Sequence, residues 1–289
     1  MKKNNLIVVV GATASGKTAR AVALAQQYNT VVVSADSRQI YAEMQIGTAR
    51  PTAAEMQGVP HFFLGNKSIQ HLYTAGEYER EVLALLDTLF EQHETVVVCG
   101  GTGLYINALC NGLDYFPVVS EAIKTQLQAD FGARGMAVLQ AELAAADPEY
   151  ASTADLQNPQ RLLRALEVCR ATGAPYSSFR TQAAKPRPFV VQKIGIEWAR
   201  ADLYARIDAR VEQMLAGGLL AEAERLYPHR YLNALQTVGY SELFDYMDGK
   251  TDLRTATERI KQHTRNYAKR QLTWFKKDQN TLWQQPENQ

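Results

Sequence analysis

The stretch whose residue types and spacing most clearly suit ligand binding is "GATASGKT", which runs from Gly11 to Thr18. Its spacing, G-x-x-x-x-G-K-[ST], lets successive backbone N–H groups face an anion, and the N-terminus of the following helix adds its dipole. Lys17 supplies a positive charge, and the Thr18 hydroxyl is placed to bind Mg²⁺. The alternative is a chance match in a glycine-containing turn. The motif predicts a phosphate site, whose ligand could be a diphosphate, a triphosphate or a dinucleotide.

A carboxylate, Asp36, lies close to the C-terminal end of the second apolar run of the chain, "TVVVSADS" (30–37). If that run is a parallel strand, Asp36 lies at the carboxyl edge of the sheet, where α/β proteins bind ligands. A carboxylate beside a bound Mg-phosphate can be a metal ligand or a general base. The structural alternative is an Asx turn that Ser34 and Ser37 support. Position favours a functional role and leaves both interpretations open.

The third apolar run, "TVVVCGGTGLY" (95–105), is informative because it lacks an acid. In a P-loop NTPase such a strand is usually followed by an aspartate that helps to hold Mg²⁺. Here the strand runs into Gly100-Gly101-Thr102-Gly103, which weakens an ATPase interpretation. The glycines also suit a tight turn. Thr102 is the polar side chain of that turn, and we expect it to face the ligand edge.

A basic segment near the C-terminus, 259–277, has aromatic residues interleaved with its charges. It has no acidic residue, and its basic residues are Arg259, Lys261, Arg265, Lys269, Arg270, Lys276 and Lys277. Basic residues neutralise phosphates, and the rings of Tyr267, Trp274 and Phe275 could stack on unpaired bases. A solvated basic helix with its aromatics in the core is the alternative. The segment "QRLLR" (160–164) places arginines on one helix face, which alone indicates only a solvated surface.

Strands and helices must alternate to position these residues. Continuous apolar runs at 5–10, 30–37 and 95–105 are typical of parallel strands that are covered on both faces. Helical spacing at 17–28 and 76–93 separates them. This order predicts an α/β fold, a P-loop NTPase-like core with a parallel sheet.

The pattern changes between Pro117 and Pro188, where the sequence predicts helices at 120–131, 136–147 and 158–173. The last begins with Asn158 as N-cap and Pro159 at the first helical position, and Gly173 is its stop signal. A strand at 188–198 and mostly helical sequence from 200 to about 277 follow. We therefore expect an inserted helical domain, 117–188, within a catalytic core formed by 1–116 and 189–289. The tail 284–289 is expected to fray.

Composition excludes several classes of protein. The net charge of +1 argues against a uniformly basic nucleic-acid binder but leaves room for a basic patch. Three cysteines without a C-x-x-C pair predict neither a disulfide framework nor a zinc site. The five histidines have neither metal spacing nor a nucleophile partner. No apolar run is long enough to span a membrane, so we expect a cytoplasmic protein and, by default, a monomer.

Taken in order, the motifs resemble those of the tRNA dimethylallyltransferases (tRNA isopentenyltransferases). The resemblance covers nearly the whole chain and rests on "GATASGKT" (11–18), "DSRQIY" (36–41), "IGTARP" (46–51), "GGTGLY" (100–105), "NPQRLLRALEV" (158–168), "QTVGY" (236–240) and "TRNYAKRQLTWF" (264–275). It implies a P-loop core with a helical insertion domain that binds tRNA. The implied reaction transfers a dimethylallyl group from dimethylallyl diphosphate to N6 of the adenine that follows the anticodon, in tRNAs reading codons that begin with U.

The resemblance also implies roles for individual residues. Asp36 would take the proton of the adenine amine, Thr102 would assist at the reaction centre, and Lys17 would stabilise the leaving diphosphate, with Mg²⁺ on Thr18. The diphosphate would be bound by Gly11, Ala12, Thr13, Ala14, Ser15, Gly16, Lys17, Thr18 and Arg210.

The tRNA anticodon stem-loop is the expected partner. The family pattern places its contacts at Asp36, Ser37, Arg38, Gln39, Thr102, Lys124, Gln160, Arg161, Leu162, Leu163, Arg164, Gln236, Thr237, Val238, Gly239, Tyr240, Ser241, Lys269, Arg270, Gln271, Leu272, Thr273, Trp274, Phe275 and Lys276.

The chain departs from the family pattern at two places. Ala12 stands where the family usually has proline, and the stretch 61–71 lacks the usual second histidine and aspartate, so family arguments about that stretch do not transfer. Two other functions remain open: a prenyltransferase that acts on free adenine nucleotides, and a P-loop kinase of small molecules. The nucleotide prenyltransferase would not need the basic segment or "QRLLR". The kinase would need ATP and an arginine-rich lid, which the sequence does not show.

Overall fold

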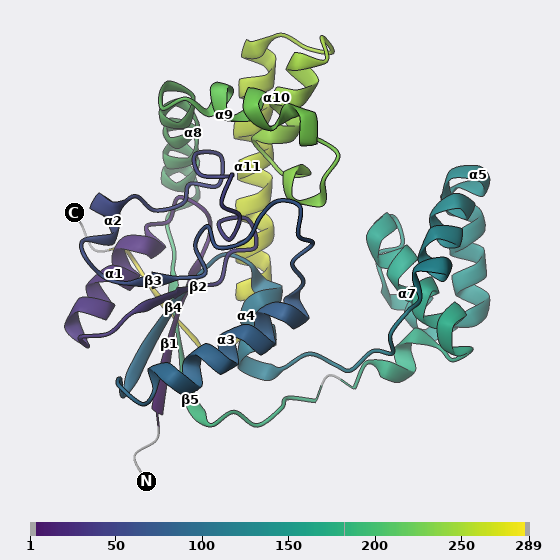
Figure 1. The fold of residues 1–289 in the computed structure, drawn as a ribbon, viewed down its shortest axis with the longest axis horizontal. Coiled ribbons are helices and arrows are strands. Elements are labelled where there is room, and N and C mark those ends of the chain that lie inside the picture. Colours follow the sequence, from purple (N-terminus) through teal and green to yellow (C-terminus); the bar gives the residue numbers. More distant parts are fainter. Residues whose placement is uncertain (1–3, 182, 287–289) are drawn as a thin grey trace. The chain divides into compact units, whose positions relative to one another are not determined.

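A computed structural model describes residues 4–181 and 183–286. The chain forms two compact units. The larger unit comprises the described residues of Met1–Asn111 and Pro186–Gln289, and the smaller, helical unit is formed by Gly112–Lys185. Figure 1 shows a sheet with flanking helices in the larger unit and helices alone in the smaller one. No helix within the described residues is both long enough and apolar enough to cross a membrane.

The larger unit is built on a six-stranded, wholly parallel sheet of order β3-β2-β4-β1-β5-β6. Its strands are β1 (Asn4–Gly11), β2 (Val32–Ser34), β3 (His61–Phe62), β4 (Thr95–Cys99), β5 (Phe189–Ile196) and β6 (Thr281–Gln284). The central strand β1 pairs with β4 on one side and β5 on the other. The α/β fold with a parallel sheet, as predicted, is confirmed.

Helices cover both faces of this sheet, which explains the continuous apolar run of β1. Leu6, Val8 and Val10 pack into the large core beneath α3, α4 and α11, whereas Ile7 and Val9 pack against α1 on the other face. The helices are α1 (Lys17–Gln27), α2 (Ala53–Met56), α3 (Ala75–Leu89), α4 (Gly103–Asn111), α8 (Arg200–Ala216), α9 (Leu219–Leu226), α10 (Tyr240–Met247) and α11 (Leu253–Phe275), with 3-10 turns η2 (Tyr227–His229) and η3 (Asn233–Leu235).

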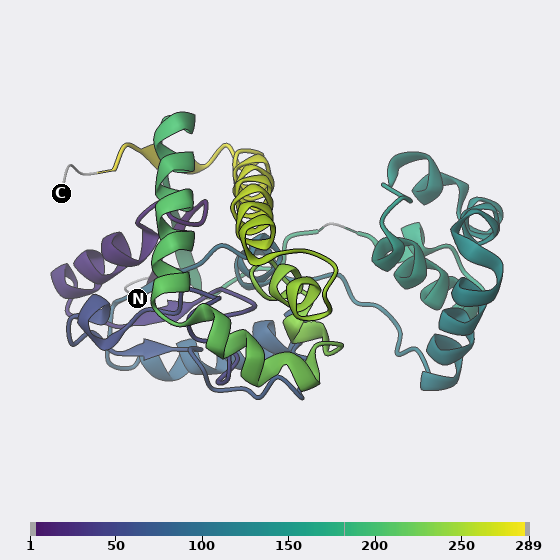
Figure 2. The same ribbon diagram turned by 90° about the horizontal axis from the view of Figure 1, so that it is seen from above.

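Two of these helices, α8 and α11, lie side by side, as Figure 2 shows. Arg265 of α11 pairs with Asp208 of α8 at 2.5 Å. Ala12 and Ala14 of the phosphate loop pack in one apolar cluster with Leu203 and Ile207 of α8 and with Ala268 of α11. Two helices from the C-terminal half of the sequence therefore pack against the phosphate loop.

The helical unit contains α5 (Glu121–Ala146), α6 (Pro148–Thr153), α7 (Pro159–Thr172) and the turn η1 (Tyr176–Phe179). The two helices predicted at 120–131 and 136–147 form α5, which is interrupted at Gly135 by a positive φ of 75°. The predicted caps of α7 are confirmed, because the Asn158 side chain accepts from the Gln160 and Arg161 N–H groups and Gly173 adopts φ 70°. Leu127, Leu139 and Leu143 of α5 pack with the apolar face of α7.

The sequence missed two strands. β3 has only two residues, and β6 adds an edge strand next to β5. The prediction of a frayed tail is wrong at Gln284, which pairs with Ile196, and residues 287–289 lie outside the described chain. Such short strands carry too few alternating positions to give a periodic signal.

Candidate functional site

The phosphate loop joins β1 to α1 through a tight backbone path. Gly11 has φ 149°, and a Cβ there would lie 2.9 Å from the Ile196 carbonyl oxygen, so only glycine fits. Gly16 caps α1 in the left-handed conformation with φ 88°. The N-terminus of α1 thus opens directly on the loop, an arrangement that favours bound anions.

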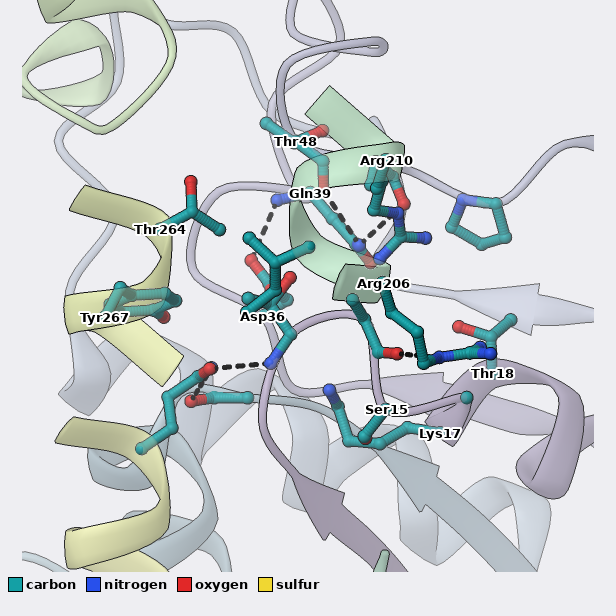
Figure 3. Close-up of a pocket in the computed structure, with 18 of the residues that line it drawn as sticks. Ser15, Lys17, Thr18, Asp36, Gln39, Thr48, Arg206, Arg210, Thr264 and Tyr267 are labelled. Atoms are coloured by element: carbon teal, nitrogen blue, oxygen red, sulfur yellow. Dashed lines mark hydrogen bonds between the residues drawn. The ribbon is translucent and has the colours of Figure 1, made fainter. Parts of the chain in front are cut away.

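A cavity of ≈ 1180 Å³ lies at the carboxyl ends of β1, β2 and β4, wholly within the larger unit. Its wall includes the phosphate loop, the loop after β2, the glycine turn after β4, and residues of α8 and α11. Figure 3 shows side chains from these segments pointing toward one another, with Lys17 and Thr18 on one side and Tyr267 on the other. The sheet edge predicted to bind a ligand therefore carries a real cavity.

The side chains that line this cavity include six basic residues: Lys17, Arg20, Arg38, Arg206, Arg210 and Arg270. The Lys17 ammonium donates to the Ala12 carbonyl oxygen at 2.6 Å. Burial lowers the pKa of Lys17 and also that of Arg210. A bound anion would restore the stabilisation that burial removes from both cations, so the cavity is suited to a multiply charged anion.

Arg206 was missed by the sequence reasoning. Its Nε donates to the Ala14 carbonyl oxygen at 3.0 Å, and its guanidinium lies 4.3 Å from the centre of the Trp198 ring. Trp198 in turn donates from Nε1 to the Ser15 carbonyl oxygen at 2.9 Å. The signal was present, because Arg206 and Arg210 have the i, i+4 spacing that puts two side chains on one helix face.

Asp36 forms the Asx turn of the structural interpretation and keeps one oxygen for the functional one. Its Oδ1 accepts from the Arg38 N–H at 2.9 Å and from the Gln39 N–H at 3.2 Å, which is an Asx turn. Its Oδ2 accepts no hydrogen bond from the described residues, and Asp36 lines the cavity (Figure 3). One oxygen is thus structural, and the other is available for chemistry.

Thr102 holds the loop that carries Asp36. Its Oγ1 accepts from the Ser37 N–H at 2.9 Å and donates to the Ser37 Oγ at 3.2 Å. Its own N–H donates to the Ala35 carbonyl oxygen. Thr102 lies behind the cavity wall, which Gly100 and Gly101 form at this point. Thr102 was expected to face the ligand edge, whereas its hydroxyl is bonded to Ser37.

The glycine turn after β4 is shaped by close packing. A Cβ on Gly100 would lie 2.2 Å from the Ala35 carbonyl oxygen, and a Cβ on Gly103 would lie 2.3 Å from Cδ1 of Trp274. A Cβ on Gly101 would lie 2.2 Å from Nε2 of Gln271. These glycines let α11 and the end of β2 approach the turn closely.

A buried carboxylate that the sequence did not reveal, Glu222 of α9, organises the adjoining wall. It accepts from the N–H groups of Gln45, Ile46 and Gly47 at 2.9–3.0 Å and from the Tyr240 hydroxyl at 2.7 Å. A Cβ on Gly47 would lie 2.6 Å from the Tyr240 ring. The motifs "IGTARP" and "QTVGY" are therefore joined through one carboxylate.

The candidate tRNA residues of the larger unit differ in exposure. The exposed ones are Gln236, Lys269, Arg270, Thr273, Trp274 and Lys276; the half-buried ones are Ser37, Arg38, Gln39, Thr237, Val238, Ser241 and Leu272; the buried ones are Gly239, Tyr240, Gln271 and Phe275. Arg38 donates to the Asn233 and Ala234 carbonyl oxygens. Phe275 belongs to the core, as the alternative interpretation of the basic segment had it.

Ion pairs neutralise part of the basic segment. Lys261 pairs with Glu212 and Glu258, and Lys276 pairs with Glu197. Lys269 has no ion-pair partner in the described chain and is exposed. Lys269 and Arg270 are thus neighbouring exposed basic residues toward the C-terminal end of α11, and Arg254 and Arg259 are exposed nearer its N-terminus.

In the helical unit, Gln160 and Arg161 are exposed, and Arg164 pairs with Glu167 at 3.1 Å. Lys124 pairs with Glu121 at 2.5 Å. Leu162 and Leu163 are buried in the unit's core at 0% and 7% exposure, so their side chains serve packing and are not displayed to a partner.

The Thr18 hydroxyl is an oxygen donor that could hold Mg²⁺. This hydroxyl lines the cavity beside Lys17 and makes no hydrogen bond within residues 4–181 and 183–286. Those residues include no cluster of three or more His, Cys, Asp or Glu side chains that could hold a metal by themselves. A single hydroxyl fits an ion whose other ligands are substrate oxygens and water, as is common for Mg²⁺.

Known proteins resemble this chain along its whole length. Residues 39–278 match the family model described as IPP transferase. The chain is 46% identical to tRNA dimethylallyltransferase 1 of Bacteroides fragilis (strain YCH46), covering 100% of this chain and 96% of the relative. It is 50% identical to the tRNA dimethylallyltransferase of Cytophaga hutchinsonii, covering 97% and 92%.

Solved structures give the same result. The full-length tRNA isopentenylpyrophosphate transferase from Bacillus halodurans has a TM-score of 0.73 and 36% identity, covering 98% of this chain and 90% of that chain. A eukaryotic dimethylallyltransferase described as acting on tRNA has a TM-score of 0.77 and 26% identity, covering 94% and 70%. The sequence, the parallel sheet and its cavity agree with these relatives, and the chain belongs to the IPP transferase family.

Proposed function

We propose that the protein transfers a dimethylallyl group from dimethylallyl diphosphate to N6 of the adenine 3′-adjacent to the anticodon, in tRNAs reading codons that begin with U. Family membership supports the reaction class. The observation that carries the proposal is one cavity whose lining includes Lys17, Arg206 and Arg210 together with Asp36, whose Oδ2 accepts no hydrogen bond from the described residues. The cations suit a leaving diphosphate, and the carboxylate suits an amine that must lose a proton.

In this mechanism, the phosphate loop, Lys17 and Arg210 bind the diphosphate, and Arg206 holds the loop through Ala14. The adenine N6 attacks the allylic carbon, a C–N bond forms, and the bond from that carbon to the diphosphate oxygen breaks. The diphosphate leaves with the electron pair, and Asp36 takes the proton from N6. Because an exocyclic amine of adenine is a weak nucleophile, the hydrogen bond to Asp36 assists the attack.

Mg²⁺, when bound, supplies positive charge that lowers the cost of releasing the diphosphate. The Thr18 hydroxyl would be its protein ligand. Thr102 acts through Ser37, because its hydroxyl is bonded to that residue. It keeps the turn around Asp36 in the geometry that aims Oδ2 at the amine.

The tRNA anticodon stem-loop is the proposed acceptor. Lys269 and Arg270 on the exposed face of α11 would neutralise backbone phosphates, and Gln160 and Arg161 of the helical unit would add contacts. The adenine would leave its stack to reach the cavity, at a cost of a few kcal/mol. We further propose that the protein acts as a monomer in the cytoplasm.

The experiment uses the purified protein, labelled dimethylallyl diphosphate, Mg²⁺ and an unmodified anticodon stem-loop, without ATP. Label is expected on the stem-loop and not on a matched stem-loop that carries guanine at the acceptor position. Transfer to AMP or ADP alone would favour the nucleotide prenyltransferase. Consumption of ATP alone would favour the kinase, an outcome that the absence of an acid in Gly100–Gly103 argues against.

A further inference from the structure

Gln271 stands apart from its neighbours on α11. Lys269, Arg270, Thr273 and Trp274 are exposed, whereas Gln271 is only 5% exposed. Its Oε1 accepts from the Thr13 N–H of the phosphate loop at 2.8 Å, and its Nε2 donates to the Gly101 carbonyl oxygen at 2.9 Å. Both polar atoms of the amide are thus used inside the protein, and the side chain lines the cavity and does not lie on the exposed face of α11.

The bridge joins three separate segments at the cavity. Thr13 belongs to the loop after β1, Gly101 to the turn after β4, and Gln271 to a helix whose next turn packs Trp274 against Gly103. Gly101 has no room for a side chain because the amide of Gln271 fills that space. An uncharged group that both donates and accepts is required here, since one partner is an N–H group and the other a carbonyl oxygen.

We propose that Gln271 is a positioning residue that fixes the phosphate loop to the RNA-facing helix α11. The inference rests on the proposed function, because it assumes that the loop binds the diphosphate and that α11 contacts the tRNA. By holding the Thr13 N–H, the amide sets the loop in the conformation that the diphosphate meets. The bond to Gly101 fixes the distance between that loop and the turn after β4, whose Thr102 bonds Ser37 beside Asp36, so donor and acceptor stay aligned.

Gln271→Met tests this, because methionine has a similar length but neither hydrogen-bonding atom. The full chain is measured for inorganic pyrophosphate affinity, for KM and kcat with dimethylallyl diphosphate, and for Kd with the stem-loop. We expect kcat/KM for the donor to fall roughly 10- to 100-fold, as misplacement of a reacting group does. Pyrophosphate affinity is expected to fall as well, with stem-loop Kd unchanged. Gln262→Met, the same change at an exposed position of α11, is the control.

A second variant protects the test against misfolding. Gln271→Glu keeps an acceptor for the Thr13 N–H but places an oxygen against the Gly101 carbonyl and adds negative charge beside the diphosphate. It is expected to lose more pyrophosphate affinity than Gln271→Met while its stem-loop Kd stays unchanged. A higher stem-loop Kd with unchanged donor kinetics would overturn the inference and make Gln271 an RNA contact; unchanged donor kinetics and pyrophosphate binding would overturn it too. Wild-type protein that binds pyrophosphate but transfers nothing would instead count against the proposed function.

Discussion

The cavity loops of the larger unit and the candidate RNA surface of the helical unit are built in opposite ways. Around the cavity, Asp36, Thr102 and Gln271 are each tied to backbone groups of other segments or of their own turn. In α7, exposed Gln160 and Arg161 stand beside buried Leu162 and Leu163. The groups proposed to perform or position the chemistry are thus held by directed polar bonds, whereas the groups proposed to contact tRNA are displayed on an apolar core.

The largest loss of turnover is expected from a change at Asp36, which tests directly whether the cavity residues perform the chemistry. Asp36→Asn keeps an oxygen to accept from the Arg38 and Gln39 N–H groups but removes the base. Turnover is expected to fall about 10²- to 10⁴-fold. Stem-loop affinity, measured by filter binding, should not change. Full turnover in this variant would show that Asp36 is not the base and that its role is limited to the Asx turn.

Lys17→Met is expected to lower kcat by about 10²- to 10³-fold, because it removes a positive charge aimed at the leaving diphosphate.

The same variant gives a pH test. In the proposed mechanism Lys17 binds the anion as a cation, and burial lowers the pKa of Lys17 from its ordinary value. Pyrophosphate affinity should therefore weaken as pH rises through that lowered pKa. The weakening should be absent from Lys17→Met and present in Lys250→Met, an exposed lysine paired with Asp245 and Asp248. If pyrophosphate affinity of Lys17→Met depends on pH as that of the wild type does, a group other than Lys17 titrates.

Leu162→Ala tests whether the surface of the helical unit depends on its apolar core. It opens a cavity in the core of the helical unit and is expected to destabilise that unit by about 2–5 kcal/mol. Hydrogen exchange should rise in Gly112–Lys185, with pyrophosphate affinity of the larger unit unchanged. Arg161→Ala, one position earlier and exposed, should leave exchange unchanged. Equal exchange in both variants would contradict the assignment of Leu162 to packing.

The smallest effect is a change of salt dependence. The double variant Lys269→Met, Arg270→Met should flatten the slope of log Kd against log salt by about 0.7–0.9 for each lost phosphate contact. Lys261→Met on the same helix is the control, because Lys261 is already paired with Glu212 and Glu258. If the slope of the double variant matches that of the wild type, the segment is a solvated helix.

Local signals in the sequence predicted much of this molecule. The apolar run of β1, the glycine loop and the caps of α7 depend on neighbours in the chain, so each could be inferred from a short window. Arg206 could have been found in the same way from its helical spacing to Arg210. Fold class and family followed from the order of such windows.

Contacts between distant segments could not be predicted in this way. The partners in the Thr13–Gln271 bond are 258 positions apart, and the Glu222 carboxylate meets Gln45 from 177 positions away. Nothing in a local window says which face of α11 or α9 turns toward which loop. For the same reason, Thr102 was expected to face the ligand edge, whereas it is not among the residues that line the cavity and bonds Ser37.

The position of β1 between β4 and β5 has a consequence for synthesis on the ribosome. Chains emerge N-terminus first, so β1 is made early but cannot complete its pairing until Phe189–Ile196 has appeared. All of Gly112–Lys185 is made in that interval and can fold while β1 waits for its second neighbour. Gln271 emerges later still. The phosphate loop is therefore among the first parts of the site to be translated and among the last to be finished.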